Sequence, residues 1–113
     1  MASRHRTVVW AESAQVALDE VVSYIAHDSR DQAIKVLIRA LEAAASLETL
    51  ADRGRLVPEL REPALREIFV FRYRLMYRVA AEQVCIVRIR PWRPRLRQLA
   101  SRRSRSARVN NAV

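Results

Sequence analysis

Arginine is the residue type in this sequence best suited to chemistry, and within residues 66–92 it alternates with apolar residues at Arg72, Arg74 and Arg78 and again at Arg88 and Arg90. A guanidinium group binds a phosphate or a carboxylate through paired hydrogen bonds, and it stays charged at physiological pH. The candidate residues for binding a partner or a target are Arg53, Arg55, Arg72, Arg74, Arg78, Arg88, Arg90 and Arg93. Together they predict a surface that attracts an anionic partner.

The net charge of +9 supports this prediction, because it is unevenly distributed along the chain. Residues 1–50 carry five basic and seven acidic side chains, a balance of −2, whereas residues 51–113 carry sixteen and five, a balance of +11. Of the 21 basic residues, 20 are arginine. A half so rich in arginine favours a polyanion or an acidic protein as partner.

The elements that must position these arginines are two strands. In residues 72–79 and 84–90, apolar residues alternate with mostly charged ones at a period of two, which is typical of strands with one buried face, and residues 65–71 are predicted to begin the same sheet as a separate strand. The break at residues 80–83 is short enough only for a hairpin. The predicted buried positions are Tyr73, Leu75, Tyr77 and Val79 in the first run, and Cys85, Val87 and Ile89 in the second.

The pairing of these strands has two alternatives if their apolar faces coincide. Val79 opposite Gln83 places Arg74 opposite Arg88, whereas Val79 opposite Cys85 places Arg74 opposite Arg90. Either register stacks guanidinium groups on one face, and like charges directly opposed on a sheet are destabilising. Either an anionic partner binds there, or carboxylates elsewhere in the fold neutralise the charges, or the face is simply the solvated side of an antiparallel sheet.

Two amphipathic helices are predicted ahead of the sheet. The first begins near Glu12 and ends near His27, and the second runs from Gln32 to about Leu50 behind a capping Ser29. Their apolar positions are Ala14, Ala17, Leu18, Val21, Tyr24 and Ile25, then Ala33, Ile34, Leu37, Ile38, Leu41, Ala44, Ala45 and Leu47. The turn between the two helices, residues 28–31, is short enough to predict an antiparallel helical hairpin.

A short apolar run, Thr7–Trp10, adds an N-terminal strand. The order is therefore β-α-α-β-β-β: an α+β fold with a small antiparallel sheet packed against the helical hairpin. Residues 7–95 form this domain, between a disordered N-terminus at 1–6 and a basic, largely disordered tail at 96–113. In the irregular segment 51–63, Gly54 is expected to adopt a positive φ.

Groups for catalysis are scarce. We read Trp10, Phe69, Trp92 and Cys85 as packing residues, and His5 and His27 as surface residues. No metal-ligand cluster, phosphate-binding glycine loop or Ser/Cys–His pair is visible, so we predict no catalytic residue, no metal and no cofactor. A single cysteine, no apolar run of about 18 residues and no signal peptide indicate a cytoplasmic protein.

Several short sequence motifs, in their order along the chain, resemble the RelE/ParE superfamily of type II toxin–antitoxin toxins, and specifically its ParE-like, plasmid-stabilisation branch. The motifs are Val8-Val9-Trp10, Tyr24-Ile25-Ala26, Arg53-Gly54-Arg55 with Pro58-Glu59-Leu60, Arg66 to Val70, and Tyr73-Arg74-Leu75-Met76-Tyr77-Arg78-Val79. The resemblance covers roughly residues 7–93. It implies a growth-inhibiting toxin held inactive by a cognate antitoxin, ParD-like or similar, whose acidic C-terminal segment folds on binding.

The resemblance leaves two targets open. ParE-like members poison DNA gyrase, whereas RelE-like members cut mRNA on the ribosome. Many nuclease relatives end the last strand in His-Gly-x-Arg; here Arg93 keeps the arginine, but Arg90 stands where the histidine would be and cannot act as base or acid at pH 7. Tyr73 or Tyr77 could supply a proton, although both fall on the predicted core face.

We therefore expect a toxin that acts by binding gyrase, with the ribosome-dependent endoribonuclease as the alternative. A third possibility, from another class, is a basic protein that binds nucleic acid through its Arg/Ser-rich tail.

Overall fold

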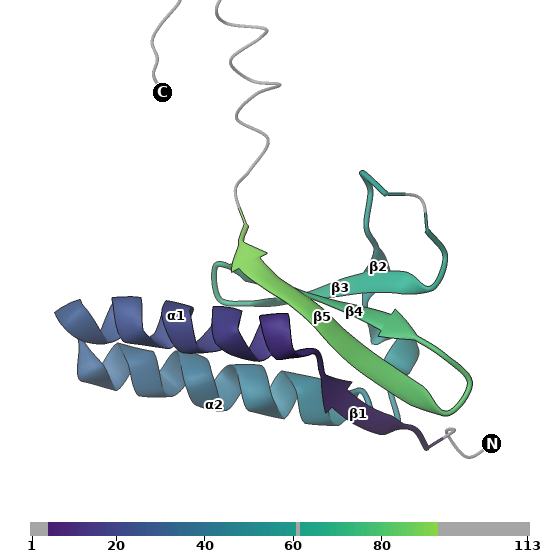
Figure 1. The fold of residues 1–113 in the computed structure, drawn as a ribbon, viewed down its shortest axis with the longest axis horizontal. Coiled ribbons are helices and arrows are strands. Elements are labelled where there is room, and N and C mark those ends of the chain that lie inside the picture. The colour runs from purple at the N-terminus through teal and green to yellow at the C-terminus, as the bar shows by residue number, and fades with distance from the viewer. Residues whose placement is uncertain (1–4, 61, 93–113) are drawn as a thin grey trace, which may run out of the picture.

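Two helices and a five-stranded sheet make up the part of the chain that the computed structural model describes, residues 5–60 and 62–92. The elements are β1 (Thr7–Trp10), α1 (Glu12–Asp28), α2 (Arg30–Ser46), a 3-10 turn (Ala51–Arg53), β2 (Arg55–Leu56), β3 (Leu65–Val70), β4 (Tyr73–Val79) and β5 (Gln83–Pro91). The helices lie side by side and the sheet packs across the end of the hairpin nearest β1 (Figure 1). The predicted α+β class and helical hairpin are confirmed; the predicted tail lies outside the described residues.

The sheet has the order β1-β5-β4-β3-β2. Hairpin neighbours run antiparallel as predicted, but β1 lies parallel to β5, with Thr7 paired to Gln83 and Trp10 to Ile86. No hairpin links these two strands, because the helices and the other strands intervene, so chain connectivity does not impose an antiparallel direction. Sequence periodicity does not indicate whether β1 pairs in the parallel or the antiparallel direction.

Residues 5 and 6 precede β1, and the Arg6 amide donates to the Glu48 carbonyl at 2.8 Å.

In helix α2 the structure confirms the predicted N-terminal cap but not the predicted C-terminal end or all of the predicted buried positions. Its predicted cap is confirmed, since Ser29 Oγ accepts a hydrogen bond from the Gln32 amide at 3.1 Å. The helix ends at Ser46 rather than near Leu50. Its buried residues are Ala33, Val36, Ala40 and Ala44, whereas the predicted core positions Ile34, Ile38 and Leu41 are 48–50% exposed.

The alanine side of α2 packs inward because small side chains let the helix approach its neighbours closely. On α1, the predicted core residue Tyr24 is 77% exposed, because the turn end of the hairpin extends beyond the sheet (Figure 1).

A β-bulge decides the register of β4 and β5. Val79 pairs with Val84 near the turn, but the pairing shifts between Met76 and Tyr77, and beyond the shift Arg74 lies opposite Arg90. One of the two predicted registers is therefore correct for that half only, because the even-numbered pairing assumed no inserted residue. The bulge also reverses the predicted faces near the turn: Val84 and Ile86 are buried in the main core, and Cys85 lies opposite Arg78.

Tyr77 joins the sheet to the segment that follows α2. Its buried hydroxyl donates to the Ala51 carbonyl at 2.7 Å and accepts from the Gly54 amide at 2.9 Å. The predicted positive φ at Gly54 is wrong, since its φ is −80°. Glycine is required there for space instead: a Cβ at Gly54 would lie 2.7 Å from the Glu67 carbonyl oxygen and would overlap the Tyr77 hydroxyl.

Tyr77→Phe is expected to lower the free energy of unfolding by about 2 kcal/mol, because it leaves the Gly54 amide and the Ala51 carbonyl without their partner. Burial also raises the pKa of the Tyr77 phenol above its ordinary value of 10.0. An unfolded chain ionises first, so the contribution of Tyr77 is complete below pH 10 and is lost as the pH rises above it. Urea unfolding at pH 8 and pH 10.5 should show a smaller alkaline loss for the variant. An equal loss would contradict this role.

Candidate functional site

The face of the sheet turned away from the helices, here called the outer face, carries most of the candidate arginines. Three cross-strand rows follow from the strand pairing: Leu65–Arg78–Cys85, Glu67–Met76–Arg88 and Phe69–Arg74–Arg90. Their alternate neighbours, such as Ile68, Leu75 and Ile89, pack toward the helices. The period-two prediction therefore placed Arg74, Arg78, Arg88 and Arg90 correctly on one face.

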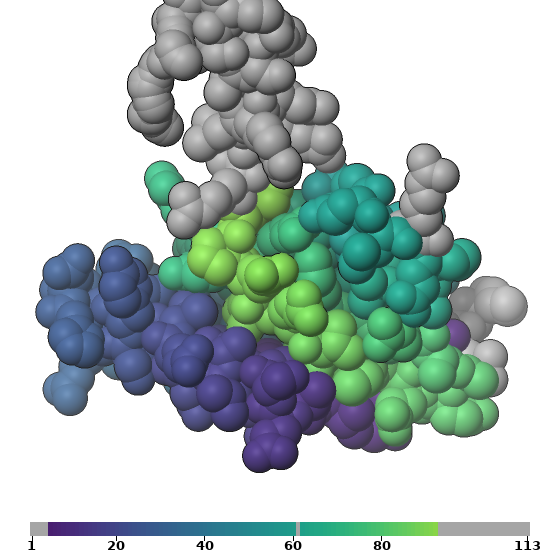
Figure 2. All heavy atoms as spheres, turned by 45° about the horizontal axis from the view of Figure 1, so that its top comes forward, coloured from purple at the N-terminus to yellow at the C-terminus, as the bar shows by residue number. Residues whose placement is uncertain are grey.

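One half of the outer face is covered by the segment between β2 and β3. Val57 from that segment packs on Leu65 and Met76, with Val87 beside them. At the other end of the face Glu59 of this segment still reaches Arg74, but Phe69 and Arg90 are exposed in the part of the chain that the structure describes. This end is called the open end of the outer face. Figure 2 shows β5 at the surface between α1 and this covering segment.

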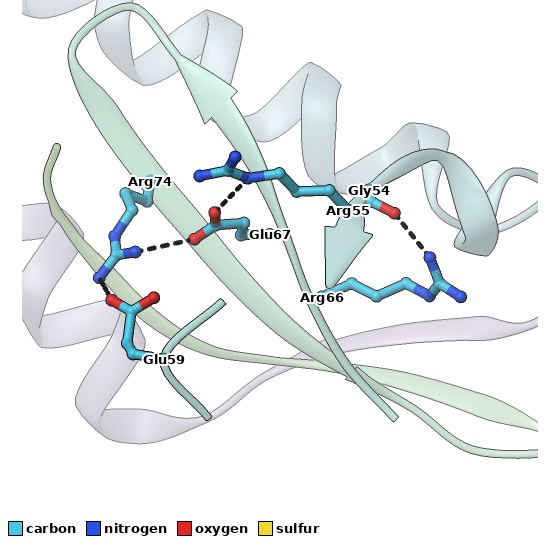
Figure 3. Close-up of polar contacts among 6 residues, drawn as sticks. All are labelled: Gly54, Arg55, Glu59, Arg66, Glu67 and Arg74. Atoms are coloured by element: carbon cyan, nitrogen blue, oxygen red, sulfur yellow. Dashed lines mark hydrogen bonds and ion pairs between the residues drawn. The ribbon is translucent and has the colours of Figure 1, made fainter. Parts of the chain in front are cut away.

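Glu67 is the centre of an ion cluster on this face (Figure 3). Its side chain is fully buried, and it accepts hydrogen bonds from Arg55 Nε at 2.6 Å and from Arg74 Nη1 at 3.0 Å. Arg74 also donates to Glu59 at 2.9 Å. Isolated charges of one sign could not be held this close together, so the carboxylates are what make the row of arginines compatible with folding.

A second pair closes the covering segment over β4. Arg78 donates to Glu62 at 2.9 Å and 3.3 Å, and this hydrogen bonding lowers the pKa of the Glu62 carboxyl while raising the pKa of Arg78. Arg66 donates to the Gly54 carbonyl at 2.7 Å, and Arg53 donates to Ser46 Oγ at 2.8 Å.

The sequence left open whether carboxylates elsewhere in the fold neutralise the arginines. They do so for three of the candidate binding arginines. Within residues 5–60 and 62–92, Arg55, Arg74 and Arg78 are paired with glutamates, whereas the side chains of Arg72, Arg88 and Arg90 make no hydrogen bond or ion pair. Arg53 is bound to Ser46, and Arg93 lies outside the described residues. Sequence reasoning missed Glu67; its signal was its place two residues before Phe69 on β3, on the same face as the arginines.

The aromatic residues at the open end of the face correct another prediction. Trp10 packs against the core as expected, but Phe69 is 43% and Trp92 41% exposed. Their rings meet edge to face with centroids 5.6 Å apart, and the Arg55 guanidinium lies 5.2 Å from the Phe69 centroid. Both rings are on the outer face, where no helix covers them.

A groove of about 400 Å³ lies between β5 and α1. Its lining residues are Ser13, Ala17, Val87, Arg88, Ile89 and Arg90. It forms because β1 pairs with β5 only as far as Ile86, after which the chain turns into α1. The unpaired arginines of β5 thus border a strand edge that no other described strand covers.

The side chains of the two tyrosines considered as possible proton donors, and of the two histidines, do not lie beside the unpaired arginines of β5. The Tyr77 hydroxyl is buried on the helix side, where it donates to the Ala51 carbonyl. Tyr73 is partly buried against a cluster of core residues, namely Leu18, Ala40, Val70 and Ile89. His5 contacts Glu48 ahead of β1, and His27 Nδ1 lies 2.9 Å from the Ser23 carbonyl in the last turn of α1. Within the described residues, no group of three His, Cys, Asp or Glu side chains is placed to hold a metal ion, and neither helix is long and apolar enough to cross a membrane.

Comparison with known proteins agrees with this fold. A solved chain from the "Chromosomal ParDE TA system from P. aeruginosa" superposes with a TM-score of 0.65 at 21% sequence identity, covering 79% of this chain and 98% of that one. No curated protein sequence matches. The family model described as "ParE toxin of type II toxin-antitoxin system, parDE" matches residues 8–93, which include both helices and, apart from Thr7, all five strands. The chain therefore belongs to the ParE toxin family of type II toxin–antitoxin systems.

Proposed function

We propose that this toxin acts in the cytoplasm and inhibits growth by binding DNA gyrase, without cleaving a bond itself, and that a ParD-like antitoxin neutralises it. The match to the ParE family over residues 8–93 carries the proposal, because gyrase is the target that the resemblance implies. The arrangement of the sheet supports it: arginines are concentrated on the outer face, and one of the two tyrosines considered as proton donors, Tyr77, donates its proton to the Ala51 carbonyl on the buried side.

The antitoxin is proposed to place acidic side chains on the outer face. Arg72, Arg88 and Arg90 are the candidate contacts, because their guanidinium groups are not already paired with a carboxylate of the described chain. The open edge of β5 beside Arg88 and Arg90 would let an extended segment approach both. Charge-assisted hydrogen bonds between guanidinium and carboxylate are the strong contacts expected in such a complex.

Induced expression tests the target. Gyrase binding predicts filamentous cells, a DNA-damage response and loss of supercoiling by purified gyrase in proportion to added toxin. The endoribonuclease alternative predicts instead rapid arrest of translation and mRNA cuts at fixed codon positions. Normal supercoiling activity together with such cuts would overturn the proposal. Purified chain that leaves both gyrase and translation unaffected would show that this member is not a toxin of either kind.

The antitoxin contact is tested with the protein encoded by the neighbouring upstream gene. Combined Arg88→Gln and Arg90→Gln should weaken its binding at least tenfold and reduce the salt dependence of the affinity, since two charge-assisted contacts are lost. Combined Arg30→Gln and Lys35→Gln, both at exposed positions of α2, removes the same two positive charges as a matched control and should bind normally. Equal weakening by the control would indicate a general charge effect and no defined site.

A further inference from the structure

The open end of the outer face joins two features that the proposed function does not use together. Phe69 and Trp92 present exposed rings in edge contact, 5.6 Å between centroids. The Trp92 amide donates to the Arg72 carbonyl at 2.7 Å, which fixes the start of the segment after β5 beside the β3–β4 turn. Two partly exposed rings in contact on a sheet surface form an apolar patch, and such a patch rimmed by polar residues is a candidate interaction site.

Arginines lie close to the rings. Arg74 and Arg90 share a cross-strand row with Phe69, and the Arg55 guanidinium lies 5.2 Å from the Phe69 ring centroid. Arg55 and Arg74 are paired with glutamates, whereas the side chains of Arg72, Arg88 and Arg90 have no partner within the described residues. Arg88 and Arg90 are spaced along one strand, and Trp92 follows two residues later, so the row extends over about 13 Å.

We propose that this end of the outer face, the Phe69–Trp92 platform, binds a single-stranded nucleic acid. Bases stack on the exposed Trp92 ring and against Phe69, while Arg72, Arg88 and Arg90 hold the phosphates. Exposed rings beside a basic strand are the arrangement that recognises unpaired bases, because every base has a flat face and every nucleotide a negative charge. A duplex cannot use the rings, since its base faces are stacked inside.

The acidic antitoxin segment proposed above would use the arginines of the platform but not its rings. Its carboxylates would satisfy the arginines, but it offers the two rings no flat partner. About two or three nucleotides match the length of the row, each pairing one base with one phosphate. Strand binding here does not depend on the identity of the toxin's target, so it can be measured with purified chain alone.

The test is fluorescence anisotropy of the full-length chain with labelled 12-nucleotide probes. Thymidine oligonucleotide should bind with an affinity that falls steeply with salt, and an abasic strand of the same length should bind roughly tenfold more weakly. Trp92→Leu should weaken binding of the thymidine probe by a similar factor, and so should combined Arg88→Gln and Arg90→Gln. Tyr24→Leu, which removes an exposed ring from α1 instead, should change nothing. A uridine RNA probe run in parallel tells whether DNA or RNA is preferred.

The abasic strand separates the platform from simple attraction to the arginines beyond Trp92. Equal binding of the abasic and the base-bearing strand would overturn the proposal, as would a Trp92→Leu variant that binds like the wild type. A 12-residue glutamate peptide, which stands in for the acidic antitoxin segment proposed for the same arginines, should also bind, but Trp92→Leu should leave its affinity unchanged because it has no base to stack. An equal loss for the peptide and the thymidine probe would overturn the proposal. Trp92 is 41% exposed, Tyr24 is 77% exposed, and the exposed Arg88 and Arg90 have no side-chain partner within the described residues, so the variants should unfold close to the wild-type temperature, which circular dichroism checks.

Discussion

Glu67→Gln is expected to lower the free energy of unfolding by about 3 kcal/mol, the lower end of the range for breaking a buried ion pair. Glutamine has the same shape but no charge, and its amide nitrogen cannot accept a hydrogen bond. Arg74, whose side chain is only 15% exposed, would keep one carboxylate, Glu59, and lose the buried one. Arg55 is about half exposed and would recover hydration, so the cost falls mainly on Arg74.

Glu62→Gln is the matched control, because it removes the same charge from an exposed pair. Glu62 and its partner Arg78 are both partly in water, so the loss should be small and should shrink further in salt. The depressed pKa of Glu62 means that its contribution is present at neutral pH and disappears as the pH falls through the folded-state value. Urea unfolding at pH 7 compares the two variants, and similar losses for both would contradict a special role for burial.

A double variant separates the ion pair from the packing around it. Glu67→Met with Arg74→Met removes both charges and keeps similar volume, so it should recover much of the stability that Glu67→Gln loses. If the double variant is as unstable as the single one, the cluster acts by shape and hydrogen bonding to the rest of the sheet, and not by charge balance.

Most of the fold follows from local patterns in the chain. Alternation in β4 identified Leu75 and Tyr77 as buried, and Ser29 with Gln32 marked the start of α2, because each signal depends only on neighbours along the chain. Such patterns cannot determine where β1 joins the sheet. They also cannot reveal an inserted residue in β5, which changes the face of Cys85 without changing its sequence neighbours.

The candidate site was predictable in its residue type and face but not in its charge balance. Arg74 and Arg90 were expected on one surface, and they are directly opposed there. The carboxylates of Glu59 and Glu62 come from an irregular segment whose path over the sheet depends on tertiary packing around Val57. Because the sequence does not reveal the course of this segment over the sheet, it cannot show which arginines are paired with a glutamate and which are not. The exposure of Phe69 and Trp92 was missed for a related reason: propensity favours aromatic residues in strands on either face.

Gly54→Ala is expected to cost about 3 kcal/mol, at the upper end for inserting a methyl group into a packed interior. The added carbon would overlap the Tyr77 hydroxyl and would lie 2.7 Å from the Glu67 carbonyl oxygen. Backbone strain is not the cause, since alanine adopts a φ of −80° without difficulty. The Tyr77 ring is fully buried and β3 is a central strand, so neither neighbour can move away cheaply.

A double-mutant cycle identifies which neighbour the methyl group displaces. In the Tyr77→Phe background the hydroxyl is absent, so Gly54→Ala should cost clearly less than in the wild type, by more than the roughly 0.5 kcal/mol within which independent effects add. The remaining cost would come from the Glu67 carbonyl. Strict additivity would place the conflict on β3 alone. Because the Glu67 side chain holds Arg55 and Arg74, displacement of its backbone would also disturb the outer face, and toxin activity should then fall together with stability.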